Sequence, residues 1–348
     1  MKVIVTGATS FIGAVTVRQL LEQGHRVCAV VRPGSRNLKH LQESVPDGCG
    51  RQLQVVALDM KEIETLGARI SQAVCGGAEG VNGAGTEMTA QAVCEDDADE
   101  TGSAGRETQV DFDAWVHIGW DGAGSDNRTK RDVQQENVVN SLAAVRAAAG
   151  LGCRSFLFTG SQAEYGVYHR VISEDMECHP VSEYGKAKVD FANQAKKLCK
   201  ILKMEYIHTR IFSVYGPGDH PWSLVQTCLA TWRQRGTMKL GECTQQWNFL
   251  YIEDAAAAII SLLTAGKGGV YNIAGNDTRC LRDYIEEMHA LCGGLGGFVY
   301  GERPQNAEGP ADLMPDISKI CGETGWQPVT AFSEGIYETL HSLREGTA

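Results

Sequence analysis

The chain has 348 residues, of which 43% are hydrophobic and 22% are charged, and it carries a formal net charge of −11 at pH 7. These values are ordinary for a soluble globular enzyme, and the length allows two domains or one large α/β unit. The negative charge argues against non-specific nucleic-acid binding, because there is no net positive field to attract phosphates.

The first two thirds of the chain alternates short apolar runs with amphipathic helical patterns, which predicts a parallel sheet with crossover helices. The predicted strands are Val3–Thr6, Arg26–Val31, Leu53–Leu58, Ala114–Ile118, Ser155–Thr159 and Glu205–Ile211. The predicted helices are Phe11–Gln23, Lys61–Val74, Arg131–Ala149 and Ser182–Leu202. The pattern indicates an α/β fold with a doubly wound parallel Rossmann sheet over residues 1–215, in which ligands bind at the carboxyl ends of the strands.

Two segments depart from this alternation. Residues 75–110 are rich in Gly, Ala, Thr and acids without any helix or strand period, which predicts an exposed inserted loop, with a lid over the substrate as the other interpretation. After Gly216-Pro217-Gly218 the elements become shorter, which predicts a smaller α/β substrate-binding lobe over residues 216–348 with a soft boundary. Its predicted strands are Trp247–Ile252 and Gly269–Ile273, and its predicted helices are Asp254–Leu263, Arg279–Leu291 and Phe332–Leu343.

A glycine-rich turn, Gly7-Ala8-Thr9-Ser10-Phe11-Ile12-Gly13, follows the first strand and opens the first helix. Gly7 suits the tight turn, and Gly13 allows the helix to pack closely on the sheet. Ser10 occupies a middle position where glycine would be more permissive. Because the backbone N–H groups of a helix N-terminus bind phosphates well, the turn predicts a site for a dinucleotide pyrophosphate.

The end of the second strand indicates which dinucleotide is bound. An acid there would bind the ribose hydroxyls of NAD, but this strand is followed by Arg32, Ser35 and Arg36, which could hold a 2′-phosphate. We therefore expect NADP rather than NAD, with a solvated arginine loop as the alternative. Asp59, which closes the third strand, is placed either to meet adenine or to cap the next helix.

Tyr184 and Lys188 stand four residues apart, about one helical turn, and so share one face of a predicted helix. Tyrosine has a pKa near 10 and is a poor base at neutral pH. A nearby ammonium group would stabilise the phenolate and allow proton transfer. Ser161, at the end of the fifth strand, could donate a hydrogen bond to the same substrate oxygen. The alternative for Tyr184 is a helix-surface tyrosine beside a solvated lysine.

With these motifs together, the chain resembles the extended short-chain dehydrogenase/reductases, the NAD-dependent epimerase/dehydratase family that works largely on nucleotide sugars. The resemblance covers nearly the whole chain apart from the insertion. It is carried by Thr6-Gly7 through Gly13, Asp59, Trp115-Val116-His117-Ile118-Gly119, Gly160-Ser161-Gln162-Ala163-Glu164-Tyr165-Gly166, Tyr184-x-x-x-Lys188, Arg210 through Pro217, and Trp247 through Asp254.

The resemblance implies that Ser161, Tyr184 and Lys188 form the catalytic group. It implies a cofactor site made of Gly7, Ser10, Phe11, Ile12, Gly13, Arg32, Ser35, Arg36, Asp59, Met60, Ile118, Gly119, Asn137, Thr159, Tyr184, Lys188, Ile211, Ser213 and Val214. Asn137 matches an asparagine that supports the catalytic lysine in such enzymes. The substrate contacts would come from Gln162, Glu164, Ser213, Trp247 and Arg303.

The chain also departs from the family pattern. Ser213 stands where many relatives carry asparagine. Trp247 stands where an arginine often binds the substrate diphosphate, which weakens the nucleotide-sugar assignment. The 4,6-dehydratases place an Asp-Glu pair after the residue that matches Ser161, whereas this chain has Gln162 and Ala163 there, which argues against dehydration.

We therefore expect an NAD(P)-dependent oxidoreductase that reduces a 4-keto group of a nucleotide-linked deoxysugar, with Tyr184 as the proton donor. Arg32 favours this reaction, because exchangeable NADPH suits a net reduction. The alternatives are a nucleotide-sugar 4-epimerase with retained NAD, an NADPH-dependent reductase of a non-sugar ketone, and a non-catalytic NADP-binding regulator. The Tyr-x-x-x-Lys pair argues against the regulator.

The remaining expectations concern setting and partners. The N-terminal apolar run is too short for a signal peptide and no stretch is long enough to span a membrane, so we expect a cytoplasmic protein with no membrane partner. The twelve cysteines are scattered without a Cys-x-x-Cys pair, which indicates neither a metal site nor a redox dithiol. By analogy with relatives, the helices from Arg131 and Ser182 could pair with their own copies in a homodimer.

Overall fold

The structure, a computed structural model, describes residues 1–75, 111–124, 127–265, 267–303 and 311–345. Contacts within the chain divide it into two compact units, and each is made of several segments. Unit 1 contains Met1–Asn127, Asp132–Thr159 and Asp190–Ile207, and unit 2 contains Arg128–Arg131, Gly160–Val189 and His208–Ala348. The predicted insertion over residues 75–110 lies outside the described residues except for Cys75, and the predicted boundary after residue 215 falls within unit 2.

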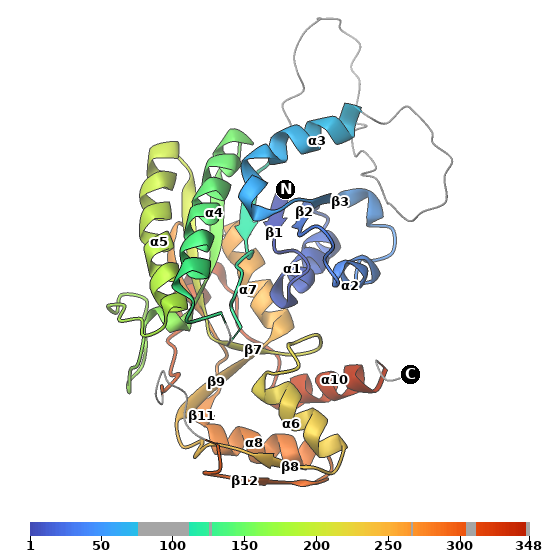
Figure 1. Cartoon of the computed structure of the whole chain (residues 1–348), viewed down its shortest axis with the longest axis vertical. Coiled ribbons are helices and arrows are strands. Elements are labelled where there is room, and N and C mark those ends of the chain that lie inside the picture. Colours follow the sequence, from blue (N-terminus) through green and yellow to red (C-terminus); the bar gives the residue numbers. More distant parts are fainter. Residues whose placement is uncertain (76–110, 125–126, 266, 304–310, 346–348) are drawn as a thin grey trace, which may run out of the picture. The chain divides into compact units, whose positions relative to one another are not determined.

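A seven-stranded sheet with the order β10-β6-β5-β4-β1-β2-β3 organises the fold (Figure 1). Its strands are β1 (Lys2–Thr6), β2 (Arg26–Val31), β3 (Leu53–Ala57), β4 (Ala114–His117), β5 (Ser155–Ser161), β6 (Glu205–Ile211) and β10 (Gly269–Ile273). In unit 1, β3 pairs with β2, β2 with β1, β1 with β4, and β4 with β5, all in parallel. Parallel neighbours need crossover connections, and this requirement accounts for the helices between them.

The sequences of these elements explain why they form. In β1 the run Val3, Ile4 and Val5 is completely buried, as expected for a parallel strand that is covered on both faces. The main helices and helical turns of unit 1 are α1 (Phe11–Glu22), α2 (Leu38–Glu43), η2 (Met60–Thr65), α3 (Leu66–Cys75) and α4 (Arg131–Gly150). Helix α1 buries Val17, Leu20 and Leu21, the three- and four-residue spacing of an amphipathic helix.

Unit 2 contains two smaller sheets and most of the C-terminal helices. Strands β7 (Ser213–Tyr215), β9 (Gln246–Tyr251) and β11 (Thr278–Cys280) form one sheet, and β8 (Thr237–Lys239) pairs with β12 (Gly297–Val299). The helices are α6 (Leu224–Arg233), α7 (Ile252–Ala265), α8 (Leu281–Leu291), α9 (Ser318–Thr324) and α10 (Phe332–Glu345), together with the first turns of α5 (Glu183–Leu202).

Aromatic side chains make up much of the core of unit 2. The ring centroids of Tyr215 and Phe249 lie 5.6 Å apart, and those of Tyr284 and Phe332 lie 4.6 Å apart in an edge-to-face arrangement. Phe249 also packs edge-to-face on Tyr284 at 5.0 Å. These contacts join β7 and β9 to α8 and α10, so elements far apart in the sequence share one apolar interior.

The predicted Rossmann-type α/β fold is confirmed, and most of its elements begin or end within two residues of the prediction. The strands Arg26–Val31, Glu205–Ile211 and Gly269–Ile273 have the predicted bounds. Gly269–Ile273, which the sequence analysis grouped with the smaller lobe, is the edge strand of the seven-stranded sheet and lies within unit 2. Within the described part of the chain, no helix is both long enough and apolar enough to cross a membrane.

Candidate functional site

The glycine-rich turn of unit 1 has the tight geometry that the sequence predicts. Gly7 adopts a φ of 73°, and a Cβ atom on Gly13 would lie 2.1 Å from the carbonyl oxygen of Gly7, so only glycine fits there. Ser10 caps α1, because its Oγ accepts a hydrogen bond from the backbone N–H of Gly13 at 3.1 Å. Phe11 and Ile12 form the first turn of α1. The turn thus presents a helix N-terminus with close backbone access, as a pyrophosphate requires.

The loop after β2 is tied to this turn. The hydroxyls of Ser35 and Thr9 lie 3.0 Å apart, and the Asn37 amide donates to the carbonyl oxygen of Thr9 at 3.3 Å. Arg32 is exposed and lies 3.6 Å from a carboxylate oxygen of Asp121, and Arg36 is exposed as well. The sequence analysis missed Asp121, and its negative charge would repel a phosphate bound to Arg32.

The side chains of Asn137 and Thr159 both form hydrogen bonds within unit 1. The Asn137 amide donates to the carbonyl oxygen of Asp121 at 2.8 Å and accepts from the N–H of Asp121 at 2.9 Å. This pair of bonds fixes the backbone of the residue that faces Arg32. The Thr159 hydroxyl donates to the carbonyl oxygen of His117 at 3.1 Å between β5 and β4. The predicted support of Lys188 by Asn137 stays a prediction.

The third group of predicted cofactor residues lies at the ends of β3 and β4. Asp59 caps η2, because its Oδ1 accepts from the N–H of Lys61 at 2.9 Å, so the helix-cap interpretation is confirmed. A Cβ atom on Gly119 would lie 3.5 Å from the backbone nitrogen of Gly7 and 3.6 Å from the sulfur of Met60. The structure therefore brings Met60, Gly119 and the glycine-rich turn together, with half-buried Ile118 beside them in the chain.

Ser161 ends β5 and begins the short helical turn η3 (Gln162–Glu164) in unit 2. Its Oγ accepts from the N–H of Ala163 at 3.2 Å, and its own N–H donates to Oε1 of Glu164 at 2.9 Å. This capping box fixes the backbone of Ser161 and directs its side chain over the turn. Gln162 is half-buried in the same turn.

Tyr184 and Lys188 lie in the first turns of α5, in the same unit as Ser161. Tyr184 is 7% exposed and Lys188 is 3% exposed, which excludes the interpretation of a surface tyrosine beside a solvated lysine. The Lys188 nitrogen lies 5.4 Å from the centroid of the Tyr184 ring. A Cβ atom on Gly185 would lie 2.5 Å from the carbonyl oxygen of Ala163, so this glycine lets α5 approach the turn that Ser161 begins.

A second cationic side chain, which was not predicted from the sequence, belongs to this group. The guanidinium carbon of Arg128 lies 4.4 Å from the centroid of the Tyr184 ring, and the Tyr184 N–H donates to the Arg128 carbonyl oxygen at 3.0 Å. Burial lowers the pKa of Lys188 to about 7; the charge of Glu164 opposes this shift and that of Arg128 adds to it. The amine of Lys188 therefore titrates near neutral pH.

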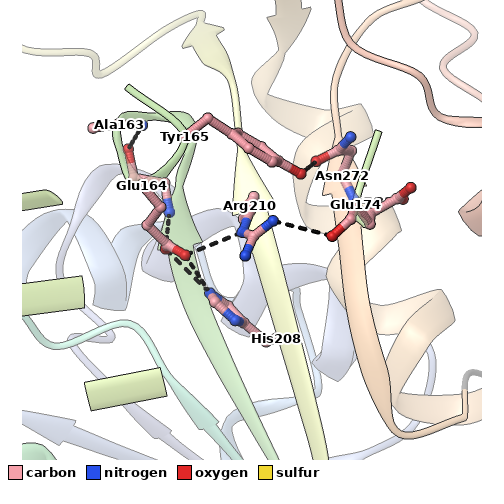
Figure 2. A network of polar contacts seen from close by, with 8 residues as sticks. Ala163, Glu164, Tyr165, Glu174, His208, Arg210 and Asn272 are labelled. Atoms are coloured by element: carbon pink, nitrogen blue, oxygen red, sulfur yellow. Dashed lines mark hydrogen bonds and ion pairs between the residues drawn. The ribbon is translucent and has the colours of Figure 1, made fainter. Parts of the chain in front are cut away.

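Glu164 is the centre of a buried network of charged groups (Figure 2). Its side chain is completely buried, and its carboxylate oxygens lie 3.1 Å from Nε2 of His208 and 3.1 Å from Nε of Arg210. Burial alone would raise the pKa of Glu164, but the attraction of His208 and Arg210 outweighs it and holds that pKa below its usual value. A side chain enclosed in this way binds other residues of the protein, whereas a contact with the substrate was expected from the sequence.

The network extends from Arg210 toward β10, as Figure 2 shows. Arg210 donates to the carbonyl oxygen of Glu174 at 3.3 Å, and the carboxylate of Glu174 accepts from the N–H of Asn272 at 2.9 Å. The Asn272 side chain in turn accepts from the hydroxyl of Tyr165 at 2.7 Å. The hydrogen bonds thus join the turn after β5 to β6, to β10 and to the loop around Glu174.

The other predicted substrate contacts are more scattered. Ser213 and Val214 are half-buried in β7, next to buried Ile211, and Arg303 is exposed at the edge of the described residues. Trp247 packs against the buried cluster that contains Tyr165, Ile172, Phe212, Ala274 and Leu313. Its indole nitrogen is buried and has no hydrogen-bond partner among the residues that the structure describes.

Comparisons with known proteins identify the family of the chain. The model of the NAD dependent epimerase/dehydratase family matches residues 3–274. The UDP-glucose 4-epimerase of Corynebacterium glutamicum is 23% identical over 94% of this chain and 91% of its own length. An uncharacterized UDP-glucose epimerase of Bacillus subtilis, YtcB, is 25% identical over 56% of this chain. The match spans 62% of the length of that relative, less than two thirds.

A solved structure shows the same fold over the whole chain. The UDP-glucose 4-epimerase of Thermotoga maritima, in complex with UDP-glucose, has a TM-score of 0.79 and 18% identity and covers 100% of both chains. The family match spans the glycine-rich turn, Ser161, Tyr184 and Lys188. This chain therefore belongs to the NAD dependent epimerase/dehydratase family.

Proposed function

We propose that the protein is a nucleotide-sugar 4-epimerase that retains NAD through its reaction. The observation that carries the proposal is the group of half-buried Ser161 and buried Tyr184 and Lys188 in unit 2. Arg128 and Lys188 lie 4.4 Å and 5.4 Å from the centroid of the Tyr184 ring. The family match supports NAD as the cofactor, and epimerases are prominent among the full-length matches. The substrate is assigned by this similarity.

The residues of unit 2 can move the proton of a secondary alcohol. Tyr184 as phenolate would take the proton from the sugar 4-hydroxyl while the C4 hydride leaves, which produces a 4-ketone. Bound NAD would supply the hydride acceptor. Ser161 would donate a hydrogen bond to the oxygen that becomes the carbonyl. After the ketone turns its other face, the hydride would return to C4 and Tyr184 would return the proton to the oxygen, so substrate and product differ only at C4.

The choice of NAD over NADP rests on Asp121. This carboxylate lies 3.6 Å from Arg32, the residue that the sequence analysis assigned to a 2′-phosphate. Both side chains are largely exposed, so the pair itself contributes little stability. A phosphate at Arg32 would nevertheless have to compete with a negative charge that is already present, whereas a ribose hydroxyl would not.

Reduction of a 4-keto sugar by NADPH is the second candidate. It is favoured by the group of Arg32, Ser35 and Arg36 after β2, which offers two cations and a hydroxyl. It needs the same proton donor, Tyr184, so the catalytic group does not separate the two reactions. Dehydration is disfavoured, because Gln162 and Ala163 offer no carboxyl group after Ser161.

The identity of the bound nucleotide separates the candidates. The purified protein would be denatured and the released nucleotide identified by mass spectrometry. It would then be assayed with UDP-glucose, UDP-galactose and a dTDP-4-keto sugar. Released NAD(H) with interconversion of the two UDP-sugars supports the epimerase. An empty site that binds NADPH and reduces the keto sugar supports the reductase instead, and binding of neither nucleotide contradicts both.

A variant tests the role of Tyr184 directly. Tyr184→Phe removes the hydroxyl and keeps the aromatic ring, so nucleotide binding should persist while turnover falls by at least about 10²-fold. Lys130→Gln, at an exposed residue next to α4, is the matched control and should keep full activity. Retained turnover in Tyr184→Phe would remove Tyr184 from the mechanism.

The homodimer and the cytoplasmic location stay predictions, and light scattering tests the first.

A further inference from the structure

The hydroxyl of Ser161 serves the reaction only when it points at the substrate oxygen, so the contacts that fix Ser161 bear on catalysis. We propose that Glu164 is a positioning residue, which holds the backbone of Ser161 and thereby aims its hydroxyl at the oxygen on C4 of the substrate. This inference deepens the proposed function and rests on it, because the role of Ser161 as a hydrogen-bond donor comes from there. Both candidate reactions need that donor.

Ser161 and Glu164 hold each other at the two ends of η3. The Ser161 N–H donates to Oε1 of Glu164 at 2.9 Å, and Oγ of Ser161 accepts from the N–H of Ala163 at 3.2 Å. A hydroxyl that accepts one hydrogen bond is polarised and becomes a better donor of its own hydrogen. Because the N–H of Ala163 occupies one side of Oγ, that hydrogen points away from η3.

The space behind Ser161 is shaped to hold the carboxylate of Glu164 in one place. This side chain is completely buried, and its oxygens lie 3.1 Å from Nε2 of His208 and 3.1 Å from Nε of Arg210. A Cβ atom on Gly160 would lie 2.3 Å from Oε1 of Glu164 and 2.4 Å from Nε2 of His208, so no side chain fits there. The two ion pairs therefore fix the oxygen to which the Ser161 N–H is bound.

The same short turn also contacts the helix that carries Tyr184. A Cβ atom on Gly185, the next residue, would lie 2.5 Å from the carbonyl oxygen of Ala163, so α5 and η3 pack backbone to backbone. A change in the position of η3 would therefore change how Ser161 lies relative to Tyr184. Two groups that act on one substrate oxygen must keep their mutual geometry, because a displacement of about 1 Å can cost about 10²-fold in rate.

A second route from Glu164 to the catalytic group runs through charge. Burial lowers the pKa of Lys188, and the negative charge of Glu164 opposes that shift. An effect through Lys188 depends on the charge at position 164, whereas the support of Ser161 depends on an acceptor oxygen that reaches its N–H. The two routes therefore predict opposite results for two conservative substitutions.

Glu164→Asp keeps the negative charge, but its side chain is one methylene shorter and should not reach the Ser161 N–H. Glu164→Gln loses the charge and keeps an acceptor oxygen at the same reach. With the nucleotide sugar that the protein turns over, Glu164→Asp should lower kcat about tenfold with KM little changed, and Glu164→Gln should stay within about threefold of the wild type. Glu177→Gln, whose carboxylate is 82% exposed, is the control and should keep full activity.

A double-mutant cycle with Ser161→Ala shows whether the effect passes through Ser161. When the hydroxyl is absent, Glu164→Asp should cause no further loss of kcat. An equal loss in both backgrounds would overturn the proposal, and so would a larger loss in Glu164→Gln than in Glu164→Asp. Near-UV circular dichroism checks folding. If Glu164→Asp unfolds, Glu164→Met replaces it, because its comparison with the equally uncharged glutamine variant isolates the acceptor oxygen.

Exchange of the Ser161 amide hydrogen with solvent tests the contact without substrate. In protein labelled with ¹⁵N-serine, Ser161→Ala identifies the resonance by its loss. Glu164→Asp should speed this exchange by about tenfold or more, and Glu164→Gln should not. Unchanged exchange in Glu164→Asp contradicts the inference, whereas a wild type that turns over none of the nucleotide sugars contradicts the proposed function.

Discussion

Replacing Glu164 tests the central claim about the buried network, namely that its charge is needed inside the protein. The change to glutamine keeps the size of the side chain and removes the negative charge, and the change to alanine removes the carboxylate altogether. Both leave the buried side chains of Arg210 and His208 without the carboxylate that they contact. Both should therefore lower the free energy of unfolding.

The magnitude follows from the partners that are lost. Glu164 accepts from the Ser161 N–H at 2.9 Å and lies 3.1 Å from nitrogen atoms of His208 and Arg210. Removing one partner of a buried ion pair costs about 3–5 kcal/mol, because the other charge is left without compensation. We expect a loss in that range for Glu164→Ala. For Glu164→Gln we expect about 2 kcal/mol, the typical value of a hydrogen bond to a charged group.

Urea denaturation at pH 7, followed by circular dichroism, measures these losses. Glu177→Gln is the matched control, since it removes a carboxylate whose side chain is 82% exposed and should change the free energy of unfolding by less than about 0.5 kcal/mol. If Glu164→Ala is no more destabilised than this control, the carboxylate does not hold the network together and the reasoning is refuted.

The dependence of the effect on pH has a definite sign. The pKa of Glu164 in the folded protein lies below its ordinary value, because His208 and Arg210 together with the hydrogen bond from Ser161 outweigh the effect of burial. Its stabilising contribution is therefore fully present above the unfolded-state pKa of about 4.3 and is lost as the pH falls through the folded-state pKa. The difference in unfolding free energy between wild type and Glu164→Gln should stay constant from about pH 8 to 5 and shrink below about pH 4.

Three further predictions test packing and burial. Gly13→Ala should lower the free energy of unfolding by about 2 kcal/mol or more and weaken nucleotide binding in calorimetry, because the new Cβ would lie 2.1 Å from the carbonyl oxygen of Gly7. Gly50→Ala is the control: no atom lies within 4 Å of its new Cβ, so the protein should be at least as stable as the wild type. Tyr215→Phe should cost about 1 kcal/mol in urea denaturation, since its buried hydroxyl donates a hydrogen bond at 3.1 Å. Cys28, whose pKa burial raises to about 12, should resist iodoacetamide at pH 8 until urea is added, as peptide mass spectrometry would show.

The central strands β1, β2 and β4 of the large sheet were predictable because each is a mainly apolar run that is buried on both faces, which a single sequence displays directly. The strands β7, β8, β11 and β12 were harder to predict, since each has only three residues and too few positions to show a period. The sequence also did not show that Gly269–Ile273 joins the seven-stranded sheet. Its apolar run indicates a strand but not the neighbour with which the strand pairs.

The site was predictable to the extent that its residues lie in local motifs. Tyr184, Lys188 and Ser161 were found by spacing, whereas Arg128 lies in an irregular loop that shows no pattern. His208 and Arg210 did leave a signal, because two polar side chains on one face of a buried strand require hydrogen-bond partners nearby. Their partner, Glu164, comes more than forty residues earlier, and the sequence alone does not show that they meet.

The family match ends at residue 274, but the core of unit 2 does not. Asp254 in α7 accepts from the N–H of Thr330 at 2.9 Å and its carbonyl oxygen accepts from the indole of Trp326 at 3.2 Å. Phe332, farther along the chain, stacks on Phe249 at 5.4 Å. A gene fragment cut at the edge of the family match would expose these aromatic and polar surfaces to water. Anyone who builds a chimaera from this protein should therefore exchange α9 and α10 together with the rest of unit 2, as a single block.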